Sequence, residues 1–402
     1  MTNKGLTLTA GLFLATVNVT AARTESTRAQ TISIQSVHTW LNAWPMVGHD
    51  PQRTNRSPET GPVYPHLLRT IKRALSNPVV GPDGTIYAWA RRALVAVDAS
   101  DRRLWRYRAS QGFGGPPVLA PNGSVGVVAL PVNVVDPKRS SILIITHDGR
   151  LTKQTEGVGF SKNAAPLVDG IGDIYFPIAG PDLVRGNPYG ELVVTSTGSG
   201  AQKLLLQQHS VDAIAEAHDG TLYALVRDYK NGGGGELVAL DTAGRELWTR
   251  LESNSTLLLG RQGTVYTAGG TTIVAYTPTG RRIWRRVESR GALALAERAD
   301  GTVLVAGSRW LDAFTPKGKR VWRAQVGRSS YYQSPALAVD SNGTAYAATG
   351  DGRLDVIARN GRRLDSLSIG PSTQYGSLAI EIGPDGKLIL TDTNGYLRVY
   401  GS

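Results

Sequence analysis

The sequence predicts an all-β fold: an eight-bladed β-propeller of four-stranded antiparallel blades, whose last blade is closed by an N-terminal strand. Three observations predict it. The 402 residues include 47 glycines and only 19% charged residues, and the apolar residues come in short runs. A hairpin unit recurs eight times, and a second hairpin unit follows it in most repeats. Short apolar runs separated by glycine suit many strands joined by tight turns better than long helices.

The first hairpin unit supplies strands A and B of each blade. VVGPDGTIYA, starting at Val79, recurs for example as LAVDSNGTAYAA at Leu337, and a weaker copy starts at Leu167. An apolar strand enters, Asp-Gly or Asn-Gly is expected to supply two positive-φ positions of a tight turn, and a β-branched or aromatic strand leaves. The turn glycines recur at roughly the spacing of propeller blades. They are Gly84, Gly123, Gly172, Gly220, Gly263, Gly301, Gly343 and Gly386.

The second hairpin unit supplies strands C and D. It reads LVALDTAGRELWTR from Leu237 and IVAYTPTGRRIWRR from Ile273, with the turn at a glycine. Four strands in each of eight repeats predict a propeller, in which only short edges are left unpaired. The last repeat ends with the strand Tyr396 to Tyr400 and lacks its fourth strand, so we expect Leu67 to Ile71 to pair there and close the ring.

Four tryptophans occupy one position of the repeat, on strand D. They are Trp105, Trp248, Trp284 and Trp322. A bulky aromatic residue at a fixed place in each blade is expected to pack against the neighbouring blade, as repeat architectures require. The alternative is a stacking surface for sugars or quinones.

The N-terminal residues differ from the repeats. Lys4 precedes a mostly apolar run from Leu6 to Val19, and the small residues Thr20, Ala21 and Ala22 follow it. This pattern predicts a signal peptide over residues 1–22. We therefore expect an exported protein, periplasmic, secreted or at the cell surface. A short uncleaved anchor is the alternative. We expect a lead-in segment over 23–65 and the propeller over 66–402, with no transmembrane segment after the leader.

Charge and cysteine content restrict the partners. The chain has no cysteine, so it can form neither a disulfide nor a thiolate metal site. Its formal net charge of +12 favours an anionic partner such as envelope lipid or an acidic polymer. Nucleic acid is not expected for an exported chain.

The repeat resembles the PQQ-like (pyrroloquinoline-quinone-type) β-propeller superfamily over essentially the whole mature chain. The Ala-x-Asp…Trp pattern of strands C and D is similar to that of quinoprotein alcohol dehydrogenases, and the opening Trp44-Pro45…Gly48…Asp50 is similar to the segment before the first blade of that superfamily. The superfamily also includes non-enzymatic exported propellers, among them the assembly lipoprotein of the outer-membrane β-barrel machinery.

The chain departs from the quinoprotein pattern in three ways. The docking pattern is one residue shorter between Asp and Trp, there is no vicinal cysteine pair, and no Glu/Asn/Asp set for a calcium ion can be placed. The resemblance therefore implies the fold of this superfamily without its cofactors, PQQ and calcium. Since one fold hosts many activities, it does not specify a function.

The expected binding site is the channel mouth, the face formed by the D–A and B–C loops. Polar and aromatic residues recur just before strand A and are expected to surround this mouth. The candidate ligand-binding residues are Phe113, Phe160, Lys162, Asn163, His209, Arg290, Tyr331, Tyr332, Gln333 and Tyr375. The alternative is that they cap the tops of the blades and bind only water.

Two further features bear on binding. Long B–C insertions in blades two to four start at Pro131, Pro177 and Arg227, and insertions grouped on one face often build a binding surface. Basic residues concentrate on strand D and the C–D turn, as in GRRIWRR from Gly280 to Arg286. These basic residues suit a partner with an anionic surface. The alternative is that their charge only keeps the outer strands from pairing edge to edge.

These observations favour a binding or scaffold protein that holds a protein, glycan or small-molecule ligand at the channel mouth. The alternative is an enzyme acting there on a small molecule or glycan. The six histidines show no metal-ligand spacing, so no metal site is expected. The adjacent pair His49-Asp50 invites a catalytic role, but its position before the closing strand favours a structural clamp.

Overall fold

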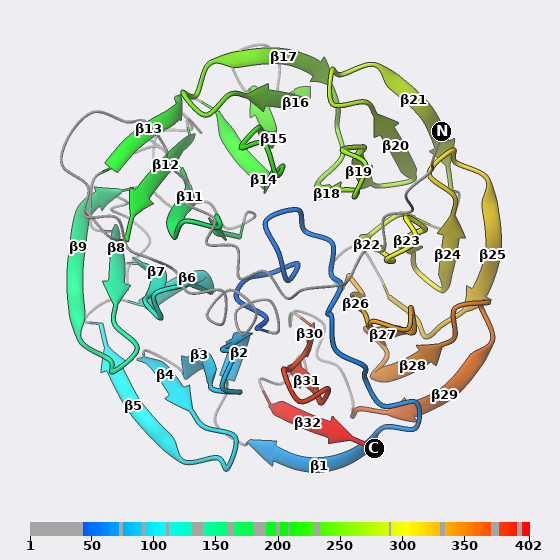
Figure 1. The fold of residues 1–402 in the computed structure, drawn as a ribbon, viewed down its shortest axis with the longest axis horizontal. Coiled ribbons are helices and arrows are strands. Elements are labelled where there is room, and N and C mark those ends of the chain that lie inside the picture. Colours follow the sequence, from blue (N-terminus) through cyan, green and yellow to red (C-terminus); the bar gives the residue numbers. More distant parts are fainter. Residues whose placement is uncertain are drawn as a thin grey trace, which may run out of the picture.

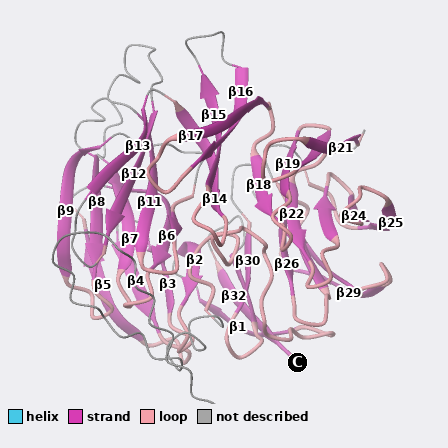
Figure 2. Cartoon of the chain, turned by 45° about the horizontal axis from the view of Figure 1, so that its top comes forward, coloured by secondary structure: helices cyan, strands magenta, loops and turns pink. Residues whose placement is uncertain are grey.

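The computed structural model forms a closed ring of eight four-stranded antiparallel sheets around a central channel (Figure 1). This confirms the predicted eight-bladed propeller. The structure describes residues 43–71, 75–90, 93–109, 112–130, 140–158, 165–179, 190–197, 202–207, 209–228, 234–288, 291–329, 334–370, 378–391 and 396–402. The predicted signal peptide lies outside these residues. Strands and loops account for the described part of the chain, in which no helix is long and apolar enough to cross a membrane (Figure 2).

Blades one to seven each use four consecutive strands, A innermost and D outermost. Blade one is β2 (Leu75–Val80), β3 (Ile86–Ala90), β4 (Ala93–Val97) and β5 (Arg103–Arg108). Blade two is β6 (Gly112–Leu119), β7 (Val125–Leu130), β8 (Ser140–Ile145) and β9 (Leu151–Val158). Blade three is β10 (Leu167–Val168), β11 (Asp173–Ala179), β12 (Gly190–Ser196) and β13 (Gln202–Gln207). Blade four is β14 (Ser210–Glu216), β15 (Leu222–Asp228), β16 (Gly234–Leu240) and β17 (Glu246–Leu251).

The second half of the ring is more regular. Blade five is β18 (Thr256–Leu259), β19 (Val265–Gly269), β20 (Thr272–Tyr276) and β21 (Arg282–Val287). Blade six is β22 (Ala294–Glu297), β23 (Val303–Ala306), β24 (Trp310–Phe314) and β25 (Arg320–Gln325). Blade seven is β26 (Ala336–Val339), β27 (Ala345–Thr349), β28 (Arg353–Ile357) and β29 (Arg363–Ser368). Blade eight is β30 (Ala379–Ile382), β31 (Leu388–Thr391), β32 (Leu397–Gly401) and β1 (His66–Ile71).

The two ends of the chain close the ring, as predicted. β1 pairs antiparallel with β32, with His66 opposite Gly401 and Ile71 opposite Leu397. The outermost strand of the last blade therefore comes from the N-terminal side of the first blade (Figure 1). Opening the ring requires this pairing to break.

The A–B turns differ from the expected two-residue type. In blade one the Gly84 N–H donates to the Gly81 carbonyl at 3.0 Å, and Gly81 N–H donates to the Thr85 carbonyl at 2.8 Å, so three residues form the loop. Gly84 has φ +78°, whereas Asp83 is not among the residues with positive φ. Asp83 instead accepts the Thr85 N–H at 3.0 Å. The Asp-Gly pair thus marks a type I turn followed by a left-handed glycine, because the aspartate caps the turn through its side chain.

The strand D tryptophans dock each blade onto the next, which confirms the packing role predicted for them. Trp284 donates its indole N–H to the Pro316 carbonyl at 2.8 Å, across the boundary between blades five and six. A Cβ added at Gly318, in the C–D turn of blade six, would lie 2.7 Å from the Trp284 ring. Trp105, Trp248 and Trp322 make the same contact with the next C–D turn. The repeat therefore needs glycine in that turn both for its positive φ and for room.

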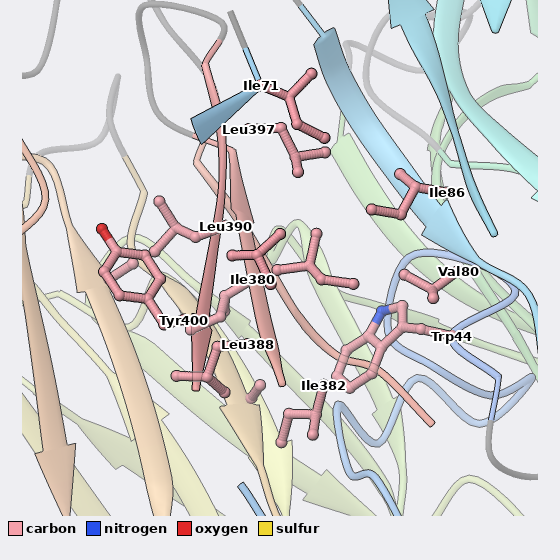
Figure 3. Packing of buried hydrophobic residues seen from close by; sticks show 14 of the residues in the cluster. Trp44, Ile71, Val80, Ile86, Ile380, Ile382, Leu388, Leu390, Leu397 and Tyr400 are labelled. Carbon is pink, nitrogen blue, oxygen red and sulfur yellow. The ribbon is translucent and has the colours of Figure 1, made fainter. Parts of the chain in front are cut away.

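Apolar residues fill the space between neighbouring blades. One buried cluster joins blades seven, eight and one, and it includes Val80, Ile382 and Leu397. Trp44, which precedes the first blade, packs in the same cluster with 2% of its surface exposed (Figure 3). The junction where the chain ends meet is thus reinforced by a residue from outside the repeats.

Candidate functional site

Residues 43–61, which we call the channel plug, cross the middle of the ring before the chain reaches β1 (Figure 1). The plug makes main-chain hydrogen bonds to the last residue of strand A in six blades. The strand residues are Val80, Leu119, Glu216, Leu259, Glu297 and Val339, and the N–H···O distances are 2.8 to 2.9 Å. Since strand A ends at the A–B turn, the plug closes that end of the channel. The sequence predicts a structural clamp here, and in the structure this segment lies inside the channel.

The plug also reaches the two remaining blades. Arg53 donates through Nη2 to the carbonyls of Ala165 and Pro166, just before the short strand A of blade three, at 2.9 and 3.0 Å. The Thr60 carbonyl lies so close to the A–B turn of blade eight that it leaves no room for a Cβ at Gly386. The plug therefore contacts every blade.

Arg53 is the central side chain of the plug. Its Nε donates to the Ile214 carbonyl at 3.0 Å, and its Nη1 donates to the Val47 carbonyl. Burial lowers the pKa of Arg53 to about 10, and the Asp50 carboxylate opposes this change. Because its donors are directed at main-chain carbonyls, this cation stabilises the plug rather than presenting a charge to a ligand.

The His49-Asp50 pair lies within the plug. Burial by itself would raise the pKa of Asp50, but the adjacent His49 ring and hydrogen bonds from the Thr54 N–H and hydroxyl hold it below its usual value. His49 has φ +75°, its ring packs edge-on against Trp44, and its Nδ1 is 3.6 Å from Asp50 Oδ2. Arg53 and Asn55 also have positive φ. Such backbone costs free energy and persists only where the surroundings fix it, here through the hydrogen bonds to the blades.

A cavity of about 170 Å³ lies between the plug and the D–A side of blades three to six. The plug forms part of its lining through Val47, Gly48, Arg53 and Asn55. The early residues of strand A supply the opposite wall, among them Asp212 in β14 and Thr256 in β18. Since the plug occupies the A–B end, this cavity belongs to the half of the channel that faces the predicted mouth.

Asp212 is the one acidic residue among those that line this cavity. Its Oδ2 accepts from Arg227 Nε at 2.6 Å, and 6% of its side chain is exposed. Its Oδ1 is buried and has no hydrogen-bond partner within the described part of the chain. Arg53 and Asp212 are the ionisable residues lining the cavity. We did not select Asp212 from the sequence, although a carboxylate that interrupts the apolar strand SVDAIAE was a usable signal.

Two other carboxylates, one buried and one half-buried, lie at the A–B end. Glu216 and Glu297 occupy the last position of strand A, where most blades have an apolar residue such as Val80. Burial raises the pKa of Glu216 to about 8, and the nearby Asp169 adds to this change. Burial raises the pKa of Glu297 to about 7, although N–H donation from Arg261 favours its charged form. No set of three or more His, Cys, Asp or Glu residues in the described ranges is arranged to hold a metal ion.

Most residues predicted to form the channel mouth lie outside the described residues. Phe160, Lys162, Asn163, Arg290, Tyr331, Tyr332, Gln333 and Tyr375 are in this group. Phe113 lies in β6, and His209 lies immediately before β14 and is partly buried. Both are at the D–A end of their strand A, on the side of the channel opposite the plug. The B–C insertions of blades two to four fall largely outside the described residues.

The basic segments lie where the sequence predicts, on the outermost strands β5, β21, β25 and β29. Some of these charges are paired: Arg323 Nη2 is 2.6 Å from Glu288, and Arg323 Nε is 2.7 Å from Asp312. Others, including Arg282 and Arg285, are exposed on β21. The outer rim of the ring is therefore basic without forming a pocket.

Comparison with known proteins agrees with the fold and its repeat. A family model described as "Outer membrane protein assembly factor BamB" matches residues 233–383. This match covers less than half of the chain, and with the eight four-stranded blades it is consistent with the predicted resemblance to PQQ-like β-propellers. No curated protein sequence matches the chain.

Solved structures share this fold at low sequence identity. A europium-containing methanol dehydrogenase is 12% identical with a TM-score of 0.67, over 89% of this chain and 91% of that one. A quinohemoprotein alcohol dehydrogenase from Pseudomonas putida is 11% identical with a TM-score of 0.67, over 92% and 82%. BamB from Moraxella catarrhalis is 16% identical with a TM-score of 0.60, over 84% and 100%. At these identities the likeness concerns the fold, which serves both enzymes and an assembly factor.

Proposed function

We propose that the protein is an exported, non-catalytic propeller that binds a ligand or partner through its channel-mouth face. The observation that carries this proposal is the plug, because it fills the A–B end of the channel and bonds to strand A of most blades. The opposite end holds the cavity, and of the predicted mouth residues Phe113 and His209 lie at that end of their strands. A ligand can therefore approach the channel from that side.

We further propose that this function needs neither PQQ nor calcium. The cavity offers one carboxylate, Asp212, which already pairs with Arg227, whereas calcium takes six to eight oxygen ligands. The chain has no cysteine for the quinone to stack against. The purified protein should take up no quinone when incubated with PQQ and Ca²⁺. A stoichiometric quinone absorbance after gel filtration would contradict this.

The proposed location and partner class follow from the leader and the charge. The predicted signal peptide over 1–22 supports export, and one structure that shares the fold is the assembly factor BamB. The basic outer strands favour a partner with an acidic surface. Cell fractionation with N-terminal sequencing tests export. An N-terminus at Met1 in the cytoplasmic fraction would contradict it.

Site-specific photo-cross-linking tests which face binds. A photoreactive residue at Tyr332 or Phe113 should cross-link to one discrete partner in the cell envelope. The control position is Gln262, which is exposed in an A–B turn on the opposite face. Equal cross-linking from Gln262, or none from the mouth positions, would refute the proposed binding face.

Activity measurements distinguish the binding proposal from the enzyme alternative. Under the binding proposal, His209→Ala and Tyr332→Ala weaken partner binding, and neither the wild-type protein nor these variants shows catalysis with small-molecule or glycan substrates. An activity that these two substitutions abolish, with the melting temperature unchanged, would establish the alternative instead.

A further inference from the structure

The outer edge of blade five is an open sheet edge on the rim of the ring (Figure 1). Its last strand, β21, pairs with β20 on one side and with no strand of the described ranges on the other. After a bulge at Ile283, the residues Trp284 to Val287 lie in regular register with β20. A strand in this position presents a row of N–H and C=O groups that can pair with another chain.

The direction of these main-chain groups follows from one hydrogen bond at the end of the strand. The Glu288 N–H donates to the Thr271 carbonyl at 2.7 Å, towards the chain that leads into β20. Successive residues of an antiparallel strand direct their N–H and C=O groups to opposite sides. Arg286 therefore bonds to β20, and Arg285 and Val287 direct their N–H and C=O groups away from the sheet.

The neighbouring blades cover the corresponding carbonyls with arginine side chains. In blade four, Arg250 Nη1 donates to the Thr249 carbonyl at 2.7 Å. In blade six, Arg363 Nη2 reaches over from blade seven and donates to the Gln325 carbonyl at 2.5 Å. These carbonyls hold the same places in their strands as the two outward carbonyls of β21. No side chain of the described residues covers the edge of β21 in this way.

The positive charge on β21 is not compensated. Arg282 and Arg285 are exposed, and neither forms a salt bridge with a carboxylate in the described part of the chain. Glu288 follows the strand, but Arg323 of blade six already pairs with it at 2.6 Å. Because opposite charges on paired strands attract and like charges repel, this edge disfavours a second copy of itself and favours an acidic strand.

Aliphatic side chains accompany these arginines. Ile283 is 43% exposed and Val287 is 61% exposed. The outer strand of blade one, β5, is also rich in arginine, but Arg108 takes the place that Val287 has in β21. The edge of blade five therefore combines free main-chain groups, unpaired cations and exposed apolar surface.

We propose that β21 binds an extended, acidic segment of a partner protein, which adds a fifth strand to blade five. The segment pairs with the outward main-chain groups of Arg285 and Val287. Its carboxylates meet Arg282 and Arg285, and its aliphatic side chains cover Val287. This surface lies on the outer rim, away from the channel mouth, so the inference goes beyond the proposed function and does not depend on it.

A short blocked peptide of alternating glutamate and valine is the probe, with calorimetry and amide hydrogen exchange as measurements. It should bind the wild type and slow exchange at Arg285 and Val287, but not at Arg286, which already bonds to β20. Arg285→Glu should weaken binding about tenfold or more, the usual effect of losing a charged hydrogen-bond partner. Val287→Pro removes one outward N–H without changing the charge, and should weaken binding about three- to tenfold.

Arg362→Glu is the matched control, because Arg362 is exposed in the C–D turn of blade seven and lies off the edge. It should bind the peptide like the wild type, whereas peptides with lysine for glutamate or with a methylated backbone should not bind. If Val287→Pro fails to fold, Arg285→Glu and the methylated peptide carry the test.

Three results would overturn the proposal: no binding of the peptide to the wild type, equal binding of the methylated peptide, or an equal loss in Arg362→Glu. Binding of phosphatidylglycerol vesicles without binding of the peptide would overturn it too, and would assign this edge to a lipid surface. The channel-mouth cross-links at Tyr332 and Phe113 are measured separately, so either proposal can fail without the other.

Discussion

Replacing Trp44 with alanine should weaken the ring at the junction of its first and last blades. The indole has 2% of its surface exposed and packs with Val80 and Ile382 (Figure 3). A buried tryptophan removes about 200 Å² from water, worth roughly 5 kcal/mol at 25 cal/mol per Å². Measured truncations of this kind cost about 3 to 5 kcal/mol. We therefore expect Trp44→Ala to lower the free energy of unfolding by about 4 kcal/mol.

Calorimetry and urea denaturation both measure this effect. For a chain of this length the entropy of unfolding is about 0.8 kcal/mol per kelvin, so the melting temperature should fall by about 5 °C. Hydrogen exchange should accelerate first in β1, β32 and β2, because Trp44 bonds to Val80 at the seam. Trp44→Phe should recover part of the stability, and Tyr64→Ala, at a residue 68% exposed, should change little. A loss below about 1 kcal/mol for Trp44→Ala would refute the anchoring role of the plug.

Trp284→Ala should cost about 3 to 5 kcal/mol in urea denaturation, and more than Trp105→Ala, because Trp284 is 9% exposed and Trp105 is only partly buried. Equal losses would contradict this ranking. Gly318→Ala should cost about 2 to 4 kcal/mol, since its φ is +77° and the new Cβ would lie 2.7 Å from Trp284. Gly270→Ala, with φ +54° and open space, should cost about 1 kcal/mol, and a reversed order would refute the steric argument. Glu297 has a folded pKa of about 7 against an ordinary 4.5, so the folded state binds more protons and stability should fall as pH rises between these values. Glu297→Gln should remove that decline, which is of the order of a few kcal/mol, and an unchanged pH profile would contradict the burial argument.

Much of the fold could be predicted because each repeat carries its own local signals. The turn glycines marked the A–B hairpins, and all eight have positive φ in the structure. The period placed Leu67 to Ile71 as the missing strand, and β1 spans His66–Ile71. The turn type was predicted less well, because the sequence pair Asp-Gly suits both a two-residue loop and the observed three-residue loop.

The candidate site was harder to predict than the fold. The loops before strand A drew attention by their polar and aromatic residues, yet most of them lie outside the described residues. Asp212 and Arg53 were passed over. Arg53 lies in a segment outside the repeats, and Asp212 is a carboxylate within strand A of a single blade. Their significance depends on contacts across more than a hundred residues, such as Arg53 with Ile214, which periodicity does not reveal.

The sequence by itself determined the number of blades, the position of their turns, the tryptophan docking and the closure of the ring. These features depend on contacts within a repeat or with the next one, so a repeated pattern encodes them. Only the tertiary structure decided the path of residues 43–61 through the channel and the cavity they leave. A segment that meets all eight blades at once has no repeat of its own, and its hydrogen bonds use main-chain groups that every residue carries.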